Sequence, residues 1–308
     1  MRNIIALGKR IYDMDNPREQ RRYVVFVARA MLHRGAFRAL CAWFQETPLR
    51  KKSIKESPFP LEQVTRAFFY KGATFQEKAE LVKGHFSYLE DHVKSEWFLP
   101  LTSVYEEPVV LWQDAYGGES FRVTLHFGTG QRKEGLLAIN MLLGQREIYQ
   151  MIFWLGRNSA GEGTLTIGAM QGPNVDEAKE LIKALTKTFF GYRTKNLILL
   201  LTQSFARALG VKHMYAVSND GYYAMNHMRR NRKLQTDFGA FWEEAGGKLT
   251  DDARFYELPL IEERKSIEEV KSQKRNLYRK RFAVLDAVEA IMAGSLEKLL
   301  KQPALHER

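Results

Sequence analysis

The sequence of 308 residues predicts an α+β fold, in which a helical N-terminal region precedes an antiparallel meander sheet with helices packed on it. Apolar side chains recur at helical intervals through the first 100 residues, whereas residues 109–172 form short strand-like runs separated by turns. After Gly172 the helical spacing returns. Strands grouped before helices are typical of α+β proteins.

The N-terminal region is expected to be helical in three segments. Residues 18–44, 61–71 and 75–93 space their apolar side chains as helices do. Residues 47–60 are polar and contain three prolines, which predicts a loop. Pro100 is expected to close this region.

The middle of the chain is expected to form the sheet. In "SFRVTLHFG" apolar and polar residues alternate strictly, which predicts a half-buried strand over 121–127. Further strands are predicted at 109–115, 135–143, 147–156 and 163–172. Most of the breaks between them have hairpin length, so the sheet should be an antiparallel meander.

The remaining elements follow from periodicity. Helices are predicted at 174–190, 195–209 and 222–234, a strand at 211–219, a hairpin at 246–260, and one or two helices over 266–300. The chain therefore divides into a helical region at 1–100, an α+β core at 101–265 and a basic helical tail at 266–308.

Composition restricts the class of protein. The content of 45% hydrophobic residues suits a globular core, and the single cysteine, Cys41, excludes an intrachain disulfide and favours a reducing compartment. No secretory signal or run long enough to span a bilayer is recognised. The expected location is the cytoplasm or the periphery of the inner membrane.

The net charge of +11 is unevenly spread. Residues 1–55 hold thirteen Lys/Arg against four Asp/Glu, and residues 264–281 hold eight against two. Such an excess favours an anionic ligand or an anionic membrane surface. The alternative is a solvated surface that keeps the protein soluble.

The stretch "GTLTIGAMQGPN" is a candidate anion site. A strand that leaves through glycine and enters a helix can present backbone N–H groups to a phosphate. The candidate residues of this site are Gln171, Gly172, Asn174, Lys187, Arg193 and Lys195. The alternative is a plain turn with solvated cations nearby.

Candidate catalytic residues are few. HExxH, GxSxG, Walker and GxGxxG motifs are absent, and the histidines are scattered, so no metal site is predicted. Tyr222 follows a predicted core strand, and Glu243 lies beside Trp242. Both are candidate proton carriers. The alternatives are a turn at Tyr222 and a structural carboxylate at Glu243.

The tail "KSQKRNLYRKR" is a candidate anion-binding surface. Its candidate residues are Lys274, Arg275, Tyr278, Arg279 and Arg281. They could contact anionic lipid or the phosphates of a nucleic acid. Nucleic acid is the weaker reading, because stacking platforms and a reading helix are not recognised.

Five stretches in order, "LTIGAMQG", "LTKTFFGYRTK", "VSN", "FWEEAGG" and "KSQKRNLYRKR", resemble the bacterial VirK/YbjX family. Together with "RRYVVFVARAMLHRGAFRALCAWF" and "HFSYL" the resemblance covers residues 20–285. The matching positions are Gln171, Gly172, Thr186, Lys187, Gly191, Arg193, Lys195, Asn219, Trp242, Gly246, Gly247, Lys274, Arg275, Tyr278 and Arg281. It implies a role in virulence or envelope stress and no particular biochemical activity.

Two positions depart from the pattern of that family. Thr194 stands where a proline is expected, and Asp220-Gly221-Tyr222-Tyr223 stands where a histidine is expected. If that histidine serves a function in the family, Tyr222 is its candidate replacement.

The order of elements also resembles the acetyltransferase (GNAT) layout, in which a turn after the fourth strand holds the pyrophosphate of acyl-CoA. Only Gln171-Gly172 remains of the usual glycine-rich loop. Three functions therefore stay open: a cytoplasmic or peripheral factor of the cell envelope, an acyl-CoA-dependent acyltransferase, and a weak nucleic-acid binder.

Overall fold

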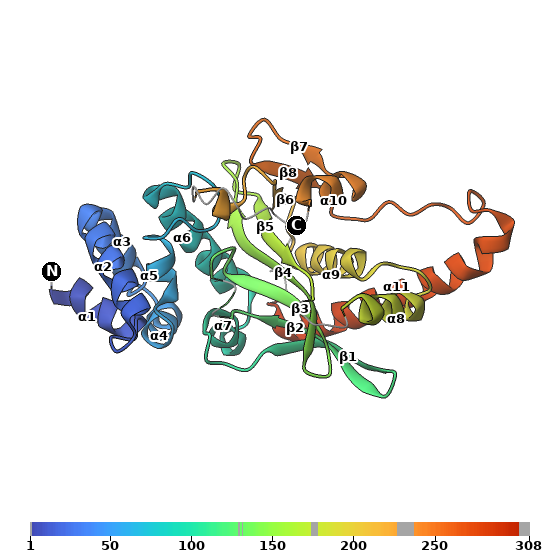
Figure 1. Ribbon diagram of the computed structural model, residues 1–308, viewed down its shortest axis with the longest axis horizontal. Coiled ribbons are helices and arrows are strands. Elements are labelled where there is room, and N and C mark those ends of the chain that lie inside the picture. The colour runs from blue at the N-terminus through green and yellow to red at the C-terminus, as the bar shows by residue number, and fades with distance from the viewer. Residues whose placement is uncertain (1, 129, 131, 174–177, 227–236, 302–308) are drawn as a thin grey trace, which may run out of the picture.

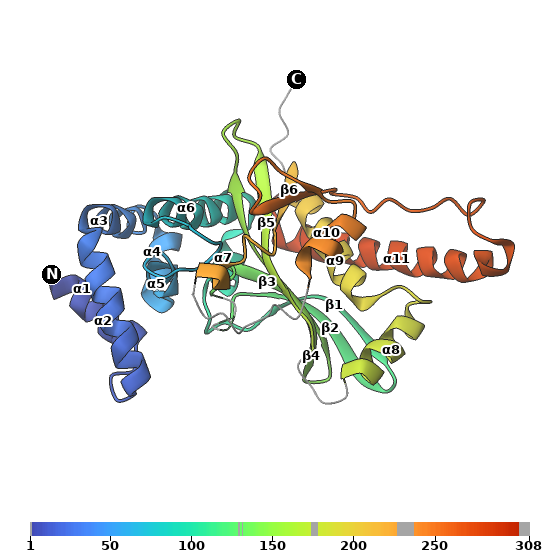
Figure 2. The same cartoon turned by 45° about the horizontal axis from the view of Figure 1, so that its top comes forward.

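The computed structural model describes residues 2–128, 130, 132–173, 178–226 and 237–301. It has a mixed α+β architecture, as the sequence predicts. A group of helices lies at one end of the molecule, a twisted sheet lies in the middle, and one long helix extends from the opposite end (Figures 1 and 2).

The helical region begins with five helices. They are α1 (Arg2–Ile11), α2 (Pro17–Leu32), α3 (Arg34–Trp43), α4 (Pro48–Glu56) and α5 (Phe59–Gln63). The single helix expected over 18–44 is divided at His33. The loop expected over 47–60 is wrong, because α4 occupies most of it. Thr47 caps α4 and Pro48 takes the first turn, where its missing N–H is no loss.

Two more helices connect this region to the sheet. The helix expected over 75–93 is confirmed as α6 (Phe75–His92), with a reciprocal capping box between Thr74 and Glu77. The helix expected over 61–71 ends early, with α5. The last helix before the sheet, α7 (Ser95–Thr102), runs two residues past Pro100, where this region is expected to close, and buries Phe98 and Leu101.

The sheet has eight strands in the order β1-β2-β3-β4-β5-β6-β8-β7. They are β1 (Val109–Tyr116), β2 (Glu119–His126), β3 (Leu137–Leu143), β4 (Arg146–Arg157), β5 (Gly163–Gln171), β6 (His213–Val217), β7 (Lys248–Leu249) and β8 (Phe255–Leu258). The first five form the predicted antiparallel meander. Strands β5 and β6 are parallel, and β8 returns antiparallel to β6.

A helical crossover joins the parallel strands, as parallel pairing requires. It consists of α8 (Ala178–Thr188) and α9 (Thr194–Ala208). Every residue of α9 from Leu197 to Ala206 is buried, and α9 packs against β3 and β4. After β6 come the short helices η2 (Tyr223–Asn226) and α10 (Phe238–Glu244). Part of the helix expected over 222–234 lies outside the described residues.

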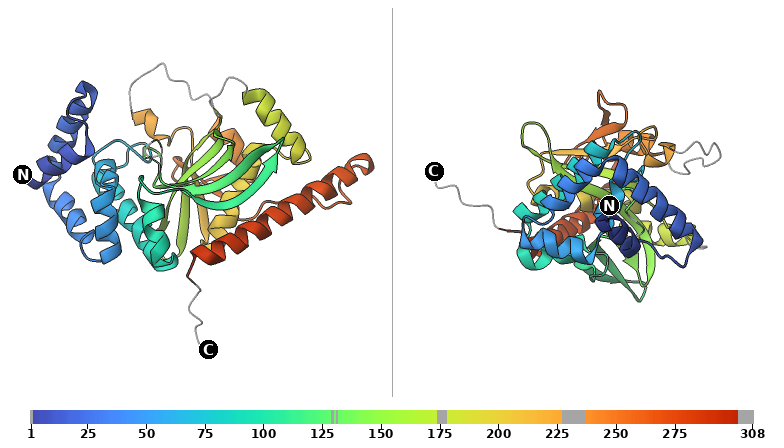
Figure 3. Two further views of the ribbon diagram at one scale, coloured as in Figure 1. Left: turned by 90° about the horizontal axis from the view of Figure 1, so that it is seen from below. Right: turned by 90° about the vertical axis from the view of Figure 1, so that its left-hand side faces the viewer.

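As far as the structure describes it, to residue 301, the C-terminal tail contains one helix, α11 (Ser272–Leu299). Its second half buries Leu285, Val288, Met292 and Leu296, where it packs on α9 and β1. Its first half extends away from the sheet (Figure 3). The residues in that half are exposed or partly exposed.

Helix α6 closes the free edge of β4. Strand β3 pairs with β4 only as far as Phe153, and beyond that point α6 runs beside β4. The Leu155 N–H donates to Nδ1 of His85 at 3.1 Å. Burial lowers the pKa of His85 to about 3, so the ring is neutral and can accept this hydrogen bond. The helical region is thus joined to the sheet by a buried polar contact.

We expect Gly168→Ala in β5 to lower the free energy of unfolding by about 1–3 kcal/mol. A Cβ there would lie 1.8 Å from the Glu134 carbonyl oxygen and 2.9 Å from the Trp154 ring. Urea denaturation measures the change. Gly294→Ala in α11 is the control, because that position is open and alanine is the better helix former. Equal effects of the two substitutions would contradict the close approach at Gly168.

Candidate functional site

The candidate site lies where β5 and β6 diverge. Their parallel pairing runs from Thr164 opposite His213 to Ile167 opposite Ala216. Beyond it, residues 168–171 of β5 continue beside β4, whereas Val217 of β6 pairs with Phe255 of β8. We call this point the β5–β6 split. Backbone groups at such a divergence are open to a ligand.

Glu134 is brought to the split by the segment that leads into β3. Gln63 of α5 fixes this segment, because its Nε2 donates to the carbonyls of Arg132 and Gly135 at 2.7 and 2.9 Å. The Phe69 N–H donates to the Lys133 carbonyl at 2.8 Å. Gly168 lets the Glu134 backbone lie directly against β5. The helical region therefore positions a residue of the sheet region.

The Glu134 carboxyl group is buried, and only 3% of the residue is exposed. Burial raises its pKa to about 7, and the hydroxyls of Tyr222 and Tyr223 oppose part of that rise. The Tyr222 hydroxyl donates to Oε1 at 3.2 Å. Among the described residues, Oε2 has no hydrogen-bond partner. A carboxyl group in this state can exchange a proton near neutral pH.

Tyr222 is held between two parts of the chain. It forms an isolated antiparallel bridge with Tyr70, and its ring packs edge-on against Tyr223 and Phe238. Burial, followed by the charge of Glu134, raises its pKa well above the usual range, so the hydroxyl keeps its proton. Trp242 supports this cluster and donates from Nε1 to the Val217 carbonyl at 3.0 Å.

A cleft of about 630 Å³ lies beside the split, between α6 and the sheet. Trp154 and Tyr70 form part of its wall, and the Trp154 ring also packs at Gly168. The hydroxyls of Thr164, Thr166 and Tyr215 come from neighbouring strands. The lining also includes four carboxylates and one guanidinium, from Glu80, Asp251, Asp252, Glu257 and Arg157. The cleft thus combines aromatic rings, hydroxyls and an excess of carboxylates.

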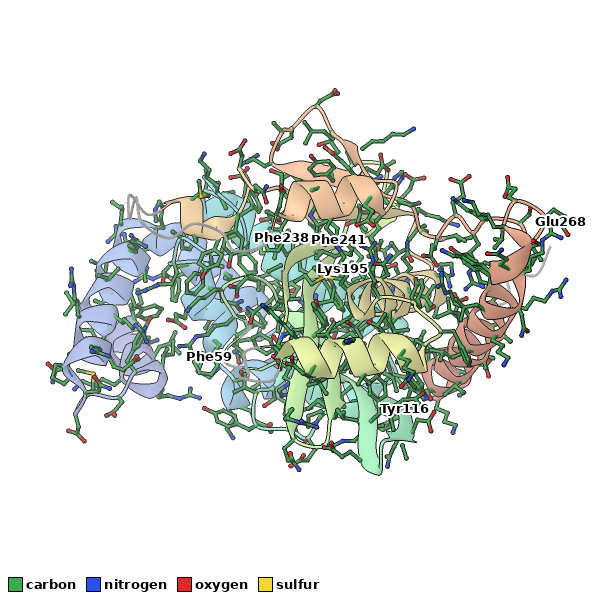
Figure 4. The ribbon with its side chains drawn as sticks, turned by 45° about the vertical axis from the view of Figure 1, so that its right-hand side comes forward. Phe59, Tyr116, Lys195, Phe238, Phe241 and Glu268 are labelled. Atoms are coloured by element: carbon green, nitrogen blue, oxygen red, sulfur yellow. The ribbon has the colours of Figure 1, made fainter. Side chains whose placement is uncertain are left out.

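The predicted anion residues are only partly brought together. Arg193 and Lys195, at the start of α9, both pair with Glu244 of α10, Lys195 at 3.3 Å. Figure 4 shows Lys195 beside Phe241, and its Nζ lies 4.6 Å from the ring centre. Lys187 is exposed on α8, and Asn174 lies outside the described residues.

The end of β5 lies close to the start of α9. Gln171 is the last residue of β5, and Gly172 follows beside the Tyr149 ring. Thr194 is buried and is the first residue of α9. The first position of a helix also accepts proline, the residue that the family pattern has at this point. Glu243 is exposed and accepts from the Tyr256 hydroxyl at 2.9 Å. Of the two candidate proton carriers, Tyr222 therefore contacts a buried carboxyl group, that of Glu134, whereas Glu243 lies at the surface.

The tail residues divide into two groups. Arg275 and Arg281 donate to main-chain carbonyls, Arg281 to that of Phe190 at 2.8 and 3.0 Å. The Arg281 guanidinium also lies over the Tyr278 ring. Lys274 and Arg279 are exposed, and no side-chain hydrogen bond or ion pair involves them within the described chain.

Glu134 and the cleft were missed by the sequence analysis. Glu134 lies in a glycine-bounded segment, "GTGQRKEG", that the strand pattern identifies only as a break after β2. An acidic residue between Lys133 and Gly135 was a signal, but a weak one. Its burial depends on Gln63, Gly168 and Tyr222, which are far from it in sequence.

The geometry described here is that of an α+β protein with a polar site at a split between parallel strands. The profile of the family described as "Protein of unknown function (DUF535)", the VirK/YbjX family, matches residues 15–294. The chain belongs to this family. No solved structure matches it significantly.

Relatives from three bacteria are similar to this chain. The uncharacterized protein YbjX of Escherichia coli is 36% identical over 43% of this chain and 41% of its own length. An uncharacterized protein of Haemophilus influenzae is 30% identical over 57% of this chain and 58% of its own length. The membrane protein LapB of Mannheimia haemolytica is 31% identical over 39% and 53%. The chain thus spans about half the length of these relatives.

Among the described residues, no helix is both long enough and apolar enough to cross a bilayer.

We expect Glu134 to make stability depend on pH. Its carboxyl titrates near pH 4.3 in the unfolded chain and at about 7 in the folded protein, so the folded state binds the proton more tightly. This contribution is complete below the unfolded pKa and is lost as the pH rises through 7. Glu134→Gln cannot ionise, so its stability relative to the native protein should increase by on the order of 3 kcal/mol between about pH 4 and about pH 8.

Urea denaturation of both proteins across this pH range measures the difference between their free energies of unfolding. The other titrating groups contribute equally to both proteins and therefore drop out of this difference. A difference independent of pH would mean that the Glu134 carboxyl ionises freely in the folded state.

Proposed function

We propose that this protein transfers an acyl group from acyl-CoA to an acceptor bound in the cleft beside the β5–β6 split. The observation that carries the proposal is the buried Glu134–Tyr222 pair at the split. A carboxyl group with a pKa of about 7 is suited to act as a general base at neutral pH.

The strand arrangement supports this assignment. A meander, a helical crossover, a parallel strand and a closing antiparallel pair follow in the order of the acetyltransferase layout. This likeness concerns topology and is only supportive, since one fold hosts many functions. Beyond Ile167, β5 still pairs with β4, but its other edge has no strand partner among the described residues and could bond the amide groups of the pantetheine arm.

The chemistry assigns a role to each member of the pair. Glu134 does not itself line the cleft, so it takes the proton of the acceptor's amine or hydroxyl through one intervening water, and the nucleophile attacks the thioester carbonyl. As the C–S bond breaks, the proton that Glu134 has taken up passes to the departing thiolate, so the products are acylated acceptor and free coenzyme A. Tyr222 keeps its proton throughout and orients the Glu134 carboxyl through their hydrogen bond. The carboxylates in the cleft favour an acceptor that carries an amine.

We expect acyl-CoA to raise the melting temperature of the native protein and of Glu134→Gln alike. The rate of coenzyme A release, measured with a thiol reagent in the presence of a panel of amines, should fall about a hundredfold or more in Glu134→Gln. Because Cys41 also reacts with thiol reagents, both proteins are used as Cys41→Ser.

Glu147→Gln is the matched control. The Glu147 carboxyl group on β4 is also partly buried, burial raises its pKa, and it accepts a hydrogen bond from Gln150. If Glu243→Gln lost activity and Glu134→Gln kept it, the general base would be the exposed Glu243 and not Glu134. Absence of both binding and release with every acyl-CoA would contradict the proposal.

A second candidate function is attachment to an anionic membrane surface through the outer end of α11. It is supported by the exposed Lys274, Arg279 and Lys280 in the projecting half of that helix, with Leu277 40% exposed among them. The Mannheimia haemolytica relative is named a membrane protein, which supports the same function. In this role the chain is a peripheral factor of the cell envelope.

We expect the protein to sediment with phosphatidylglycerol vesicles and much less with phosphatidylcholine vesicles. Salt should weaken the binding. Lys274→Glu/Arg279→Glu should reduce it at least tenfold. Lys179→Glu/Lys183→Glu on α8 changes the net charge equally and should have little effect. Unchanged binding in the α11 variant would contradict this function, and binding to short DNA without vesicle binding would replace lipid by nucleic acid.

A further inference from the structure

A second cavity lies within the N-terminal helices, apart from the cleft at the sheet. It has a volume of about 480 Å³ and is bounded by α1, α3, α4 and α5. Its apolar lining comes from Ala6, Leu7, Cys41, Phe44, Ile54 and Leu61. This volume is within the range of small-ligand sites, about 300–1,000 Å³.

The cavity results from how α1 packs. On one side Gly8 lets α1 lie tightly against α2, since a Cβ there would be 2.8 Å from the Tyr23 ring. On the other side α1 reaches α4 through Arg10, which donates to the Lys55 carbonyl at 2.6 Å. The space between these two contacts is left open to a ligand.

The charged groups that line this cavity are all cations. They are Arg10 of α1 and Lys51 and Lys55 of α4, and its described lining includes no carboxylate. Lys51 and Lys55 are four residues apart on α4, so they project from the same side. Both are exposed, and neither side chain has an ion pair among the described residues. Two amide side chains, Asn3 and Gln45, complete the lining, so the cavity combines apolar side chains and two amides with a positive rim.

We propose that this cavity binds a free fatty acid, with the acyl chain among the apolar side chains and the carboxylate at Arg10, Lys51 and Lys55. An apolar chain matches the lining, and a single anionic head matches the rim. A neutral or cationic amphiphile would leave these cations without a partner. This inference does not rest on the proposed acyl transfer, because the two cavities share no residue.

Cys41 provides the measurement. It is the only cysteine in the chain and lines this cavity. Burial raises the pKa of its thiol to about 11, so the thiol is neutral and reacts slowly with a small methanethiosulfonate reagent. A ligand in the cavity should slow that reaction further. The rate of labelling of the full chain, followed by mass spectrometry, therefore reports occupancy.

Laurate, below its micellar concentration, should slow Cys41 labelling at least tenfold, whereas dodecylamine and dodecanol should not. Affinity should rise severalfold with each added methylene. Lys51→Glu/Lys55→Glu should weaken protection by laurate at least tenfold. Lys52→Glu is the matched control, because Lys52 lies between them on α4 and does not line the cavity.

Three results would overturn the proposal. Equal protection by laurate and dodecylamine would mean that the cavity recognises apolar surface alone. No protection by any amphiphile would make it a packing void. Protection by phosphatidylglycerol vesicles without protection by laurate would assign the site to a lipid headgroup. The amphiphile series uses the native chain, so the test stands even if the double variant does not fold.

Discussion

The parallel pairing of β5 and β6 is the constraint on which the rest of the structure depends. Hairpins suffice for the first five strands, but a parallel neighbour has to be reached by a crossover, and α9 is buried in that role. The pairing lasts only to Ile167. Beyond it the two strands take different partners, and Glu134, which approaches β5 at Gly168, meets Tyr222 beside the split.

The helical region contributes to this opening through buried hydrogen bonds rather than by covering the sheet. His85 accepts a hydrogen bond from the free edge of β4, and Gln63 holds the segment that carries Glu134. Buried polar groups of this kind are costly to leave unpaired, so they fix the position of the helices on the sheet. These contacts gather residues around the Glu134 carboxyl group from three segments: α5, the segment that leads into β3, and the segment that follows β6.

The basic residues of the chain serve two different purposes. Many are structural: Arg50 pairs with Glu90, Arg132 with Glu62, and Arg207 and Arg264 with Glu289. Those left without ion pairs among the described residues include Lys51 and Lys55 at the N-terminal cavity and Lys274 and Arg279 on α11. The net charge alone did not indicate this division, because it depends on which acidic residues the fold places nearby.

By itself the sequence predicted the α+β class, the meander, the helices between β5 and β6 and a helical tail, because these depend on local periodicity. It failed at Pro48, where Thr47 caps α4 and proline fits the first turn, and it left open whether the tail holds one helix or two. Of the candidate site it supplied Tyr222. Only the tertiary structure decided that Tyr222 meets Glu134, because that contact joins residues 88 positions apart, and burial, not residue type, shifts the pKa of the carboxyl group.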